Sequence, residues 1–343
     1  MLAFCEFSFG ADIIIITDPP GVQPKSPSVV RCGEHLAPSY NGMSRAFTGV
    51  EVNAVVEAFA TAAKRLYDAG FDGLELHGAH GYLINQFLGP ETNRREDEWG
   101  SSAGGARSRF HFLFEIIKAI KEKVPGLDAL GTGRHGTTQV EASNSSRPFL
   151  IGVRISPERN CGVRLEDSLA LAHELSEGGW VDFLHLSCWD IRQTSVQSNP
   201  GARPAELPLT EWFTRRVRNL PPVITTGSVW TLEDCRLGFN MGADLIGVGR
   251  SAIGNWDWAA RICDADESEQ HYSDQVRDDR KGEILARGKY REPQNYRGSY
   301  QPLLPPYSEE HLTGCGLSPV FVYYMRRWKF VKDPQGRILP FKE

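Results

Sequence analysis

The stretch FDGLELHGAHGYLINQFLGP, Phe71–Pro90, is the most informative part of the sequence for the fold, because it contains a predicted strand and the loop that follows it. Gly73–His77 is expected to form this strand, and His80 and Tyr82 follow in the loop beyond its carboxyl end. In parallel α/β folds, ligands bind at the carboxyl edge of the sheet. We therefore expect the functional site in this loop.

Strand-like and helix-like segments alternate on both sides of this stretch. Upstream, Thr48 and Glu51 form a capping box that opens a helix, and Gly70 occupies its C-cap position. Six strand–helix pairs in series predict a parallel sheet, because parallel neighbours need a crossover helix. A doubly wound sheet and a barrel both satisfy this pattern. The predicted strands are Ile13–Thr17, Gly73–His77, Phe149–Ile155, Val181–Leu186, Val223–Thr226 and Leu245–Val248, and the helices after Gly70 are Arg109–Lys123, Glu166–Glu177, Glu211–Asn219 and Leu232–Phe239.

Composition excludes several classes of protein. The net charge of −5 argues against a nucleic-acid partner, since no basic tract balances phosphate. The seven cysteines are scattered and contain no CxxC pair, so we predict neither a metal site nor a disulfide framework. The longest apolar run, Ile13–Ile16, is too short to span a membrane, and no signal peptide is visible. We expect a cytoplasmic protein.

Two stretches interrupt the alternation. Gly126–Pro148 is polar and rich in Gly, Ser and Thr, which predicts an inserted surface loop. Residues 264–306 are charged and show little apolar periodicity, which is typical of a long excursion or a partly disordered segment. The predicted organisation is a main domain over 1–263, this excursion, and a C-terminal docking segment over 307–343.

Three side chains in the quoted stretch can carry chemistry. His77 and His80 can both donate hydrogen bonds to one ligand oxygen. An unperturbed phenol has a pKa of about 10, so Tyr82 can deliver a proton at neutral pH. The alternative is that the two histidines are structural loop residues or half of a metal site, although no carboxylate pattern completes such a site.

Four motifs, in order, resemble the old yellow enzyme family of NAD(P)H:flavin oxidoreductases. They are Gly70–Gly100, Gly152–Ser156, Pro222–Ser228 and Gly242–Arg250. The resemblance extends from about Ile13 to Ile262 and implies a (β/α)₈ barrel that holds FMN at its C-terminal face. It therefore favours the barrel over the doubly wound sheet.

The resemblance also implies a role for each residue of the loop. His77 and His80 match the pair that binds the carbonyl or nitro oxygen of the substrate. Tyr82 matches the proton donor. The implied reaction is reduction of FMN by NAD(P)H, then hydride transfer from flavin N5 to an activated alkene, which Tyr82 protonates on the opposite face.

Further residues match the cofactor site of the family. Arg154 falls on the strand arginine beside the flavin pyrimidine edge, with a structural salt bridge as the alternative. Two stretches match the phosphate-binding loops of the family. Their glycines let backbone amides approach an anion closely, and their arginine adds a positive charge. The expected phosphate-binding residues are Gly227, Ser228, Gly249 and Arg250.

The N-terminal part departs from the family pattern. The first two strand–helix units have no counterpart, so residues 1–263 are expected to form an incomplete barrel of strands three to eight. Ile16 stands where the family has a flavin-contacting glutamine, and Pro19 where it has a turn histidine. Three explanations stay open: a shortened ene-reductase, a protein that binds FMN weakly, and a flavin-free isomerase or cyclase. A non-catalytic truncated homologue is a further alternative.

The C-terminal segment regains aromatic character. Phe321, Tyr324 and Trp328 lie at near-helical spacing, which predicts a last helix that docks on the body. The alternative is that the tail covers the barrel mouth of its own subunit or of a neighbour in a homo-oligomer. The residues of that interpretation are Tyr323, Tyr324, Arg326, Arg327 and Trp328.

Overall fold

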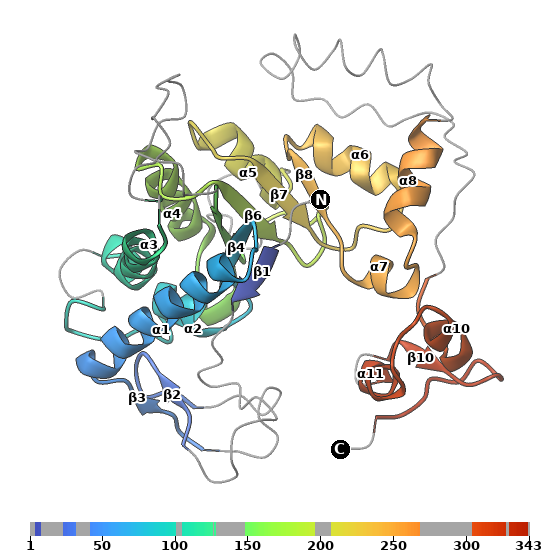
Figure 1. The fold of residues 1–343 in the computed structure, drawn as a ribbon, viewed down its shortest axis with the longest axis horizontal. Helices are drawn as coiled ribbons and strands as arrows, with labels where there is room; N and C mark the ends of the chain where they lie inside the picture. Colours follow the sequence, from blue (N-terminus) through green and yellow to red (C-terminus); the bar gives the residue numbers. More distant parts are fainter. Residues whose placement is uncertain are drawn as a thin grey trace. The chain divides into compact units, whose positions relative to one another are not determined.

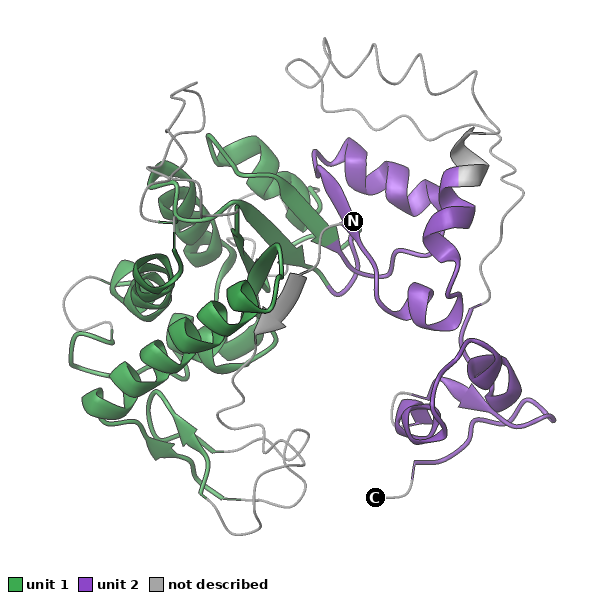
Figure 2. Cartoon of the chain, viewed as in Figure 1, with its two compact units in different colours: residues 1–188, 192–225 green, residues 189–191, 226–343 purple. Residues whose placement is uncertain are grey.

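The computed structural model divides the chain into two compact units, which are shown in different colours in Figure 2. Unit 1 comprises Met1–Cys188 and Arg192–Thr225, and unit 2 comprises Trp189–Ile191 and Thr226–Glu343. The structure describes residues 4–7, 23–31, 42–100, 105–125, 127, 148–195, 207–267, 304–326 and 329–341.

A sheet forms the centre of unit 1. Its strand order is β1-β4-β5-β6-β7, and the pairs β1–β4, β4–β5 and β5–β6 are parallel. Helices α1, α3 and α4 lie along one face of this sheet (Figure 1). The strands are β1 (Phe4–Phe7), β4 (Gly73–Gly78), β5 (Leu150–Ile155), β6 (Phe183–Ser187) and β7 (Val223–Thr226). The helices are α1 (Gly49–Asp68), α2 (Leu83–Leu88), α3 (His111–Lys123), α4 (Leu165–Glu177) and α5 (Leu209–Arg216), with 3₁₀ turns η1 (Arg107–Phe110) and η2 (Asn160–Gly162).

The start of α1 confirms the predicted capping box. Glu51 N donates to Thr48 Oγ1, and Thr48 N donates to a Glu51 carboxylate oxygen. The same carboxylate binds Lys25 and Arg45, which lie in the paired short strands β2 (Lys25–Ser26) and β3 (Arg45–Ala46). Glu51 therefore joins this small ladder to the helix.

Apolar side chains of α1 and α3 fill the space beside the sheet. Phe112 stacks on Phe87 of α2, with ring centroids 3.9 Å apart. The buried residues of η1 and α3 recur at helical spacing and include Phe110, Leu113, Ile117 and Ile120. Phe112 and Ile116 are also fully buried, whereas Phe114 is half-buried.

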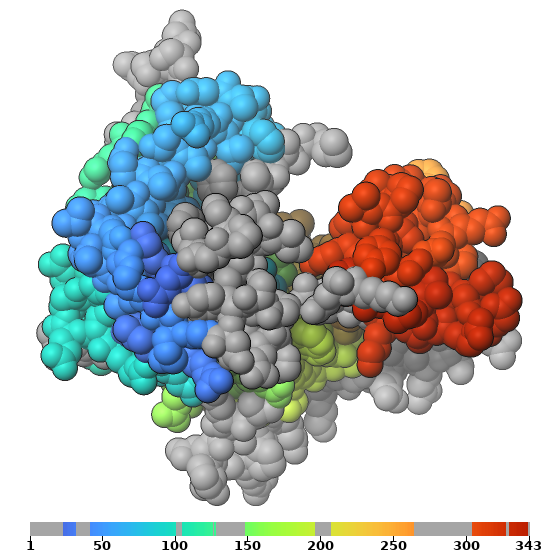
Figure 3. Space-filling view, turned by 90° about the horizontal axis from the view of Figure 1, so that it is seen from below, coloured from blue at the N-terminus to red at the C-terminus, as the bar shows by residue number. Residues whose placement is uncertain are grey.

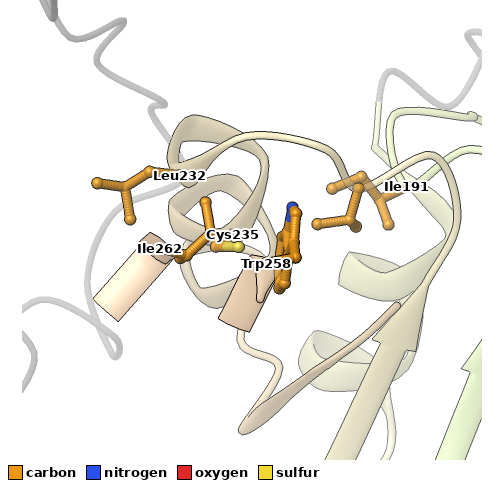
Figure 4. Packing of buried hydrophobic residues seen from close by; sticks show 6 residues of the cluster. Ile191, Leu232, Cys235, Trp258 and Ile262 are labelled. Carbon is orange, nitrogen blue, oxygen red and sulfur yellow. The ribbon is translucent and has the colours of Figure 1, made fainter. Parts of the chain in front are cut away.

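Unit 2 is built around the indole of Trp258. This ring lies between Cys235 and Ile191 in Figure 4, and its Nε1 donates to the Trp230 carbonyl at 2.7 Å. The elements of this part are α6 (Leu232–Asn240), β8 (Leu245–Gly247), α7 (Arg250–Gly254) and α8 (Trp258–Glu267).

The C-terminal segment, coloured red in Figure 3, has a core of its own within unit 2. Val322 and Met325 are the buried residues of its last helix, whereas Phe321 and Tyr324 are 38% and 37% exposed. Docking of this helix on the body through Phe321 and Tyr324 stays a prediction, and Trp328 lies outside the described residues. The elements are β9 (Tyr307–Ser308), α10 (Glu309–Gly314), α11 (Pro319–Met325) and β10 (Val331–Lys332).

Five of the six predicted strands are present within two residues of their expected ends. The sixth, Ile13–Thr17, lies outside the described residues, as do Ile16 and Pro19. Strand β1 (Phe4–Phe7), where no strand was predicted, pairs with β4 beside β5 on its other edge. Most of Gly126–Pro148 and of 264–306 also lies outside the described residues. None of the described helices has the length and apolar composition needed to cross a bilayer.

Candidate active site

Strand β4 and its neighbours align the candidate residues in rows. In the parallel register, His77 of β4 lies opposite Arg154 of β5, and Arg154 lies opposite His185 of β6. Because alternate residues of a strand face the same side, Glu75 shares the face of His77. Sheet register therefore places Arg154 next to His77 and His185.

A tight turn follows β4 and carries His80 and Tyr82. His80 and Gly81 both have positive φ angles, 59° and 82°, and Tyr82 N donates to the Ala79 carbonyl at 3.2 Å. Two consecutive positive φ angles closed by such a bond are the pattern of a type I′ turn. The turn reverses the chain at the end of the strand and starts α2 at Tyr82.

The turn brings the three predicted rings together. The His77 and His80 centroids are 5.0 Å apart, and the His77 and Tyr82 centroids are 4.8 Å apart. His77 is 6% exposed, Tyr82 is half-buried and His80 is exposed. The buried imidazole thus lies next to both of the more accessible groups.

Ser187 at the end of β6 connects Arg154 to His80. Arg154 Nη2 donates to Ser187 Oγ at 3.0 Å, and His80 Nε2 lies 2.8 Å from the same oxygen. This contact was not predicted. Its signal is the alternation in FLHLS, which places Phe183, His185 and Ser187 on one face of a buried strand.

An acid–base pair joins this row to the next row of the sheet. His185 Nδ1 is 2.7 Å from Oε2 of Glu75, which lies two residues before His77 on β4, and both side chains are largely buried. In the row of Glu75, the ring of Phe183 occupies the space that a side chain at Gly152 would need, because a Cβ there would lie 2.0 Å from Phe183 Cε2. The motif glycine at 152 therefore makes room for an aromatic ring.

The predicted phosphate-binding residues belong to unit 2. Arg250 Nη2 donates to Ser228 Oγ at 3.2 Å, and Ser228 Oγ donates to the Trp189 carbonyl at 3.2 Å. Gly227 has a φ of 150°, and the space around the Cα of Gly249 is open. The Arg250 guanidinium, the Ser228 hydroxyl and the backbone amides at Gly227 and Gly249 are the kinds of hydrogen-bond donor that bind a phosphate.

Two later residues of the Gly70–Gly100 motif, Asn93 and Arg95, hold the backbone in place. Asn93 Nδ2 donates to the carbonyls of Phe87 and Trp99, both at 2.8 Å. Arg95 Nη1 donates to the carbonyls of Pro27 and Phe47. The Asn93 bonds fold the loop after α2 back on itself, and the Arg95 bonds hold this loop to the segment that carries β2 and β3.

A buried arginine also fixes the C-terminal end of α2. Arg109 Nε donates to the Leu88 carbonyl at 2.8 Å, and its Nη2 lies 3.4 Å from Asp167. Burial lowers the pKa of Arg109, and the nearby Asp167 carboxylate opposes that shift. Arg109 therefore ties α2 to the start of α4.

Comparison with known proteins identifies the family to which this chain is similar. The model of the NADH:flavin oxidoreductase / NADH oxidase family matches residues 17–269. The chain is 34% identical over 253 residues to the NADH:fumarate oxidoreductase of Klebsiella pneumoniae. The match covers 73% of this chain and 24% of the relative.

Solved structures confirm the barrel class over the doubly wound alternative. Morphinone reductase in complex with tetrahydroNAD is 25% identical with a TM-score of 0.51, and the match covers 74% of this chain and 62% of that one. The old yellow enzyme homologue of Zymomonas mobilis is 23% identical with a TM-score of 0.55, over 77% and 67% of the two chains. The chain thus spans about two thirds of these barrel proteins.

Proposed function

The chain belongs to the NADH:flavin oxidoreductase / NADH oxidase family, and from this premise we propose that it reduces the activated C=C bond of an enone-type small molecule. Membership implies FMN as the cofactor and NAD(P)H as its reductant. The observation that carries the proposal is the cluster of the His77, His80 and Tyr82 rings, with neighbouring centroids 5.0 and 4.8 Å apart.

The residues of the chain fit the chemistry of FMN. Arg154 would hold the flavin ring, and a fixed cation there favours negative charge on the pyrimidine edge. Four residues of unit 2 would hold the phosphate: Gly227, Ser228, Gly249 and Arg250. When bound, FMN supplies the hydride chemistry that no protein side chain provides.

Tyr82 is the proposed proton donor. Its phenol holds a proton at Oη and delivers it to the α-carbon of the substrate. The ring lies half-buried beside His77, so one side of the phenol is shielded while the other can meet a ligand. Positioned proton transfer of this kind contributes typically about 10²–10⁴-fold to a rate.

His77 and His80 are the proposed binding pair for the activating oxygen. Their N–H groups donate to the carbonyl oxygen, where negative charge develops during reduction. Because His80 Nε2 contacts Ser187 Oγ, a substrate oxygen bound at that nitrogen replaces the hydroxyl. Arg154 Nη2 then keeps its hydrogen bond to Ser187 Oγ, so the guanidinium stays in place.

A visible absorption spectrum tests this proposal. Protein purified with added FMN is expected to show flavin absorbance that bleaches with NADPH without oxygen and returns when an enone is added. A colourless protein that takes up no FMN overturns the proposal. A protein whose bound flavin is reduced by NADPH but never reoxidised by enones overturns the substrate class alone.

A second candidate function is a flavin-free isomerase or cyclase. One observation favours it: unit 1 contains the whole His77, His80 and Tyr82 cluster and needs no phosphate-binding residue to assemble it. This function predicts product formation without NAD(P)H that is lost in Tyr82→Phe. Strict dependence on NAD(P)H eliminates it.

A further inference from the structure

We propose that Asn85 and Gln86 are positioning residues, whose side-chain amides lock the Gly81 peptide and so set where His80 and Tyr82 lie. The inference rests on the proposed function and adds to it the element that holds the proton donor in place. Neither residue reaches the reacting atoms in this role, because each acts through the turn.

The two side-chain amides bind the N–H and the carbonyl group of the same residue, Gly81. Gly81 N donates to Asn85 Oδ1 at 2.8 Å, and Gln86 Nε2 donates to the Gly81 carbonyl at 2.6 Å. Both side chains come from α2 and are almost completely buried, at 1% and 0% exposure. Gly81 lies between His80 and Tyr82, so fixing its backbone also restricts the positions of these two neighbours.

The turn needs this support because its backbone is strained. A residue other than glycine with φ near +60° costs about 1–2 kcal/mol relative to its usual conformations, and His80 has a φ of 59°. His80 N donates to Ser156 Oγ at 3.1 Å, which anchors the turn to the end of β5. Together with the bond from Tyr82 N to the Ala79 carbonyl, every backbone N–H from His80 to Tyr82 is held.

Packing alone does not account for asparagine at position 85. Because Gly81 N is a donor, the acceptor oxygen of the amide must face it, and this fixes the orientation of the side chain. Among the described residues, Asn85 Nδ2 then has no hydrogen-bond partner. A buried donor of this kind costs about 1–3 kcal/mol, which a leucine of similar shape would avoid. The asparagine is therefore explained by its bond to Gly81.

Release of the turn is expected to affect proton delivery selectively. A displacement of about 1 Å at a reacting group can cost on the order of 10²-fold in rate. Tyr82 acts only when the substrate is reduced. The step in which NAD(P)H reduces the flavin does not use its proton.

The test compares the same chemical change at the two neighbouring positions. Asn85→Asp keeps an acceptor for Gly81 N, whereas the ionised side chain of Gln86→Glu has no donor for the Gly81 carbonyl. Both place a carboxyl group in an equally buried site, so the cost of burial is matched. Asn93→Leu is the structural control, since Asn93 is also 1% exposed and its side-chain amide bonds to backbone groups of Phe87, Arg95 and Trp99, outside the turn.

Stopped-flow absorbance of the FMN-loaded protein measures the two half-reactions separately. Gln86→Glu is expected to slow flavin reoxidation by an enone about 10²-fold and to change flavin reduction by less than about threefold. Asn85→Asp is expected to keep reoxidation within about tenfold of the parent protein. Equal losses in both half-reactions, as expected for Asn93→Leu, or equal effects of the two carboxylate variants overturn the inference.

Amide hydrogen exchange gives a readout that needs no flavin. Gln86→Glu is expected to speed exchange at Gly81 and Tyr82, and Asn85→Asp is not. If the parent protein binds no FMN, the proposed function fails while this measurement still decides whether the two amides hold the turn. Unchanged exchange in Gln86→Glu overturns the inference in either case.

Discussion

The phenol of Tyr82 and the imidazole of His77 lie with ring centroids 4.8 Å apart and planes inclined at 45°. His77 belongs to a buried strand, while Tyr82 stands on the turn that follows it. The His77 ring is therefore fixed by the strand, whereas the position of the Tyr82 ring depends on the turn. Substitutions at the two residues are expected to have different effects.

Tyr82→Phe keeps the ring packing and removes the proton. Reoxidation of the reduced flavin by an enone is expected to slow by about 10²–10⁴-fold, with flavin reduction by NADPH unchanged. Stopped-flow absorbance follows both steps. Equal rates in the variant and the parent protein would show that another group supplies the proton.

His77→Ala and His80→Ala each remove one donor to the developing oxyanion. The loss of one such donor typically costs about 10²–10³-fold in kcat. The larger effect is expected for His77, because it is the buried member and water cannot easily replace it. Steady-state kinetics with one enone check the order, and a larger effect at His80 would contradict it.

Arg250→Ala is expected to weaken FMN binding, and Arg250→Lys to restore only part of it, because lysine keeps the charge but not the fork. The affinity is measured by fluorescence quenching of added FMN at two salt concentrations. Arg215→Ala is the control, since Arg215 pairs with Glu211 within α5. Equal affinities in Arg250→Ala and Arg215→Ala would remove Arg250 from the phosphate site.

Gly152→Ala is expected to destabilise the fold by about 1–3 kcal/mol, because the new methyl group overlaps the ring of Phe183. The same substitution in a Phe183→Leu background should cost less, since the ring is gone. Urea unfolding of the two single variants and the double variant gives the coupling energy. Additive effects would show that the two positions are independent.

Acid is expected to loosen the junction of β2, β3 and α1. Hydrogen bonds from Arg45, from Thr48 N and from Lys25 lower the pKa of Glu51 well below its usual 4.5. The ionised form therefore stabilises the fold above about pH 4.5, and this contribution is lost as pH falls further toward the folded-state pKa. Glu51→Gln should flatten the pH dependence of unfolding in that range. An unchanged dependence would contradict the assignment.

Much of the strand–helix alternation was predictable, because buried parallel strands and amphipathic helices leave distinct apolar periods. Strand β1 was not, since FCEF is short and shows little of either pattern. In the last helix, Val322 and Met325 are buried in the core of the C-terminal segment, a role that the aromatic spacing does not reveal.

The ring cluster of the candidate site was predictable from a motif, but its supports were not. Ser187 is 107 residues from His80 and His185 is 110 residues from Glu75, so strand register rather than sequence proximity brings each pair together. The amides of Asn85 and Gln86 look like ordinary helix residues until the turn geometry shows what they bind. Contacts to the backbone leave no periodic signal.

The absence of a side chain at Gly254 has a consequence for the whole C-terminal tail. A Cβ at this position would lie 2.2 Å from the Tyr307 ring, and the Gly254 carbonyl accepts a hydrogen bond from His311 Nε2. Helix α7 begins with Arg250 and ends at Gly254. Loss of the tail would therefore remove contacts that hold the C-terminal end of the helix that carries this arginine. Tail removal should then lower affinity for an anion without altering any residue that touches it.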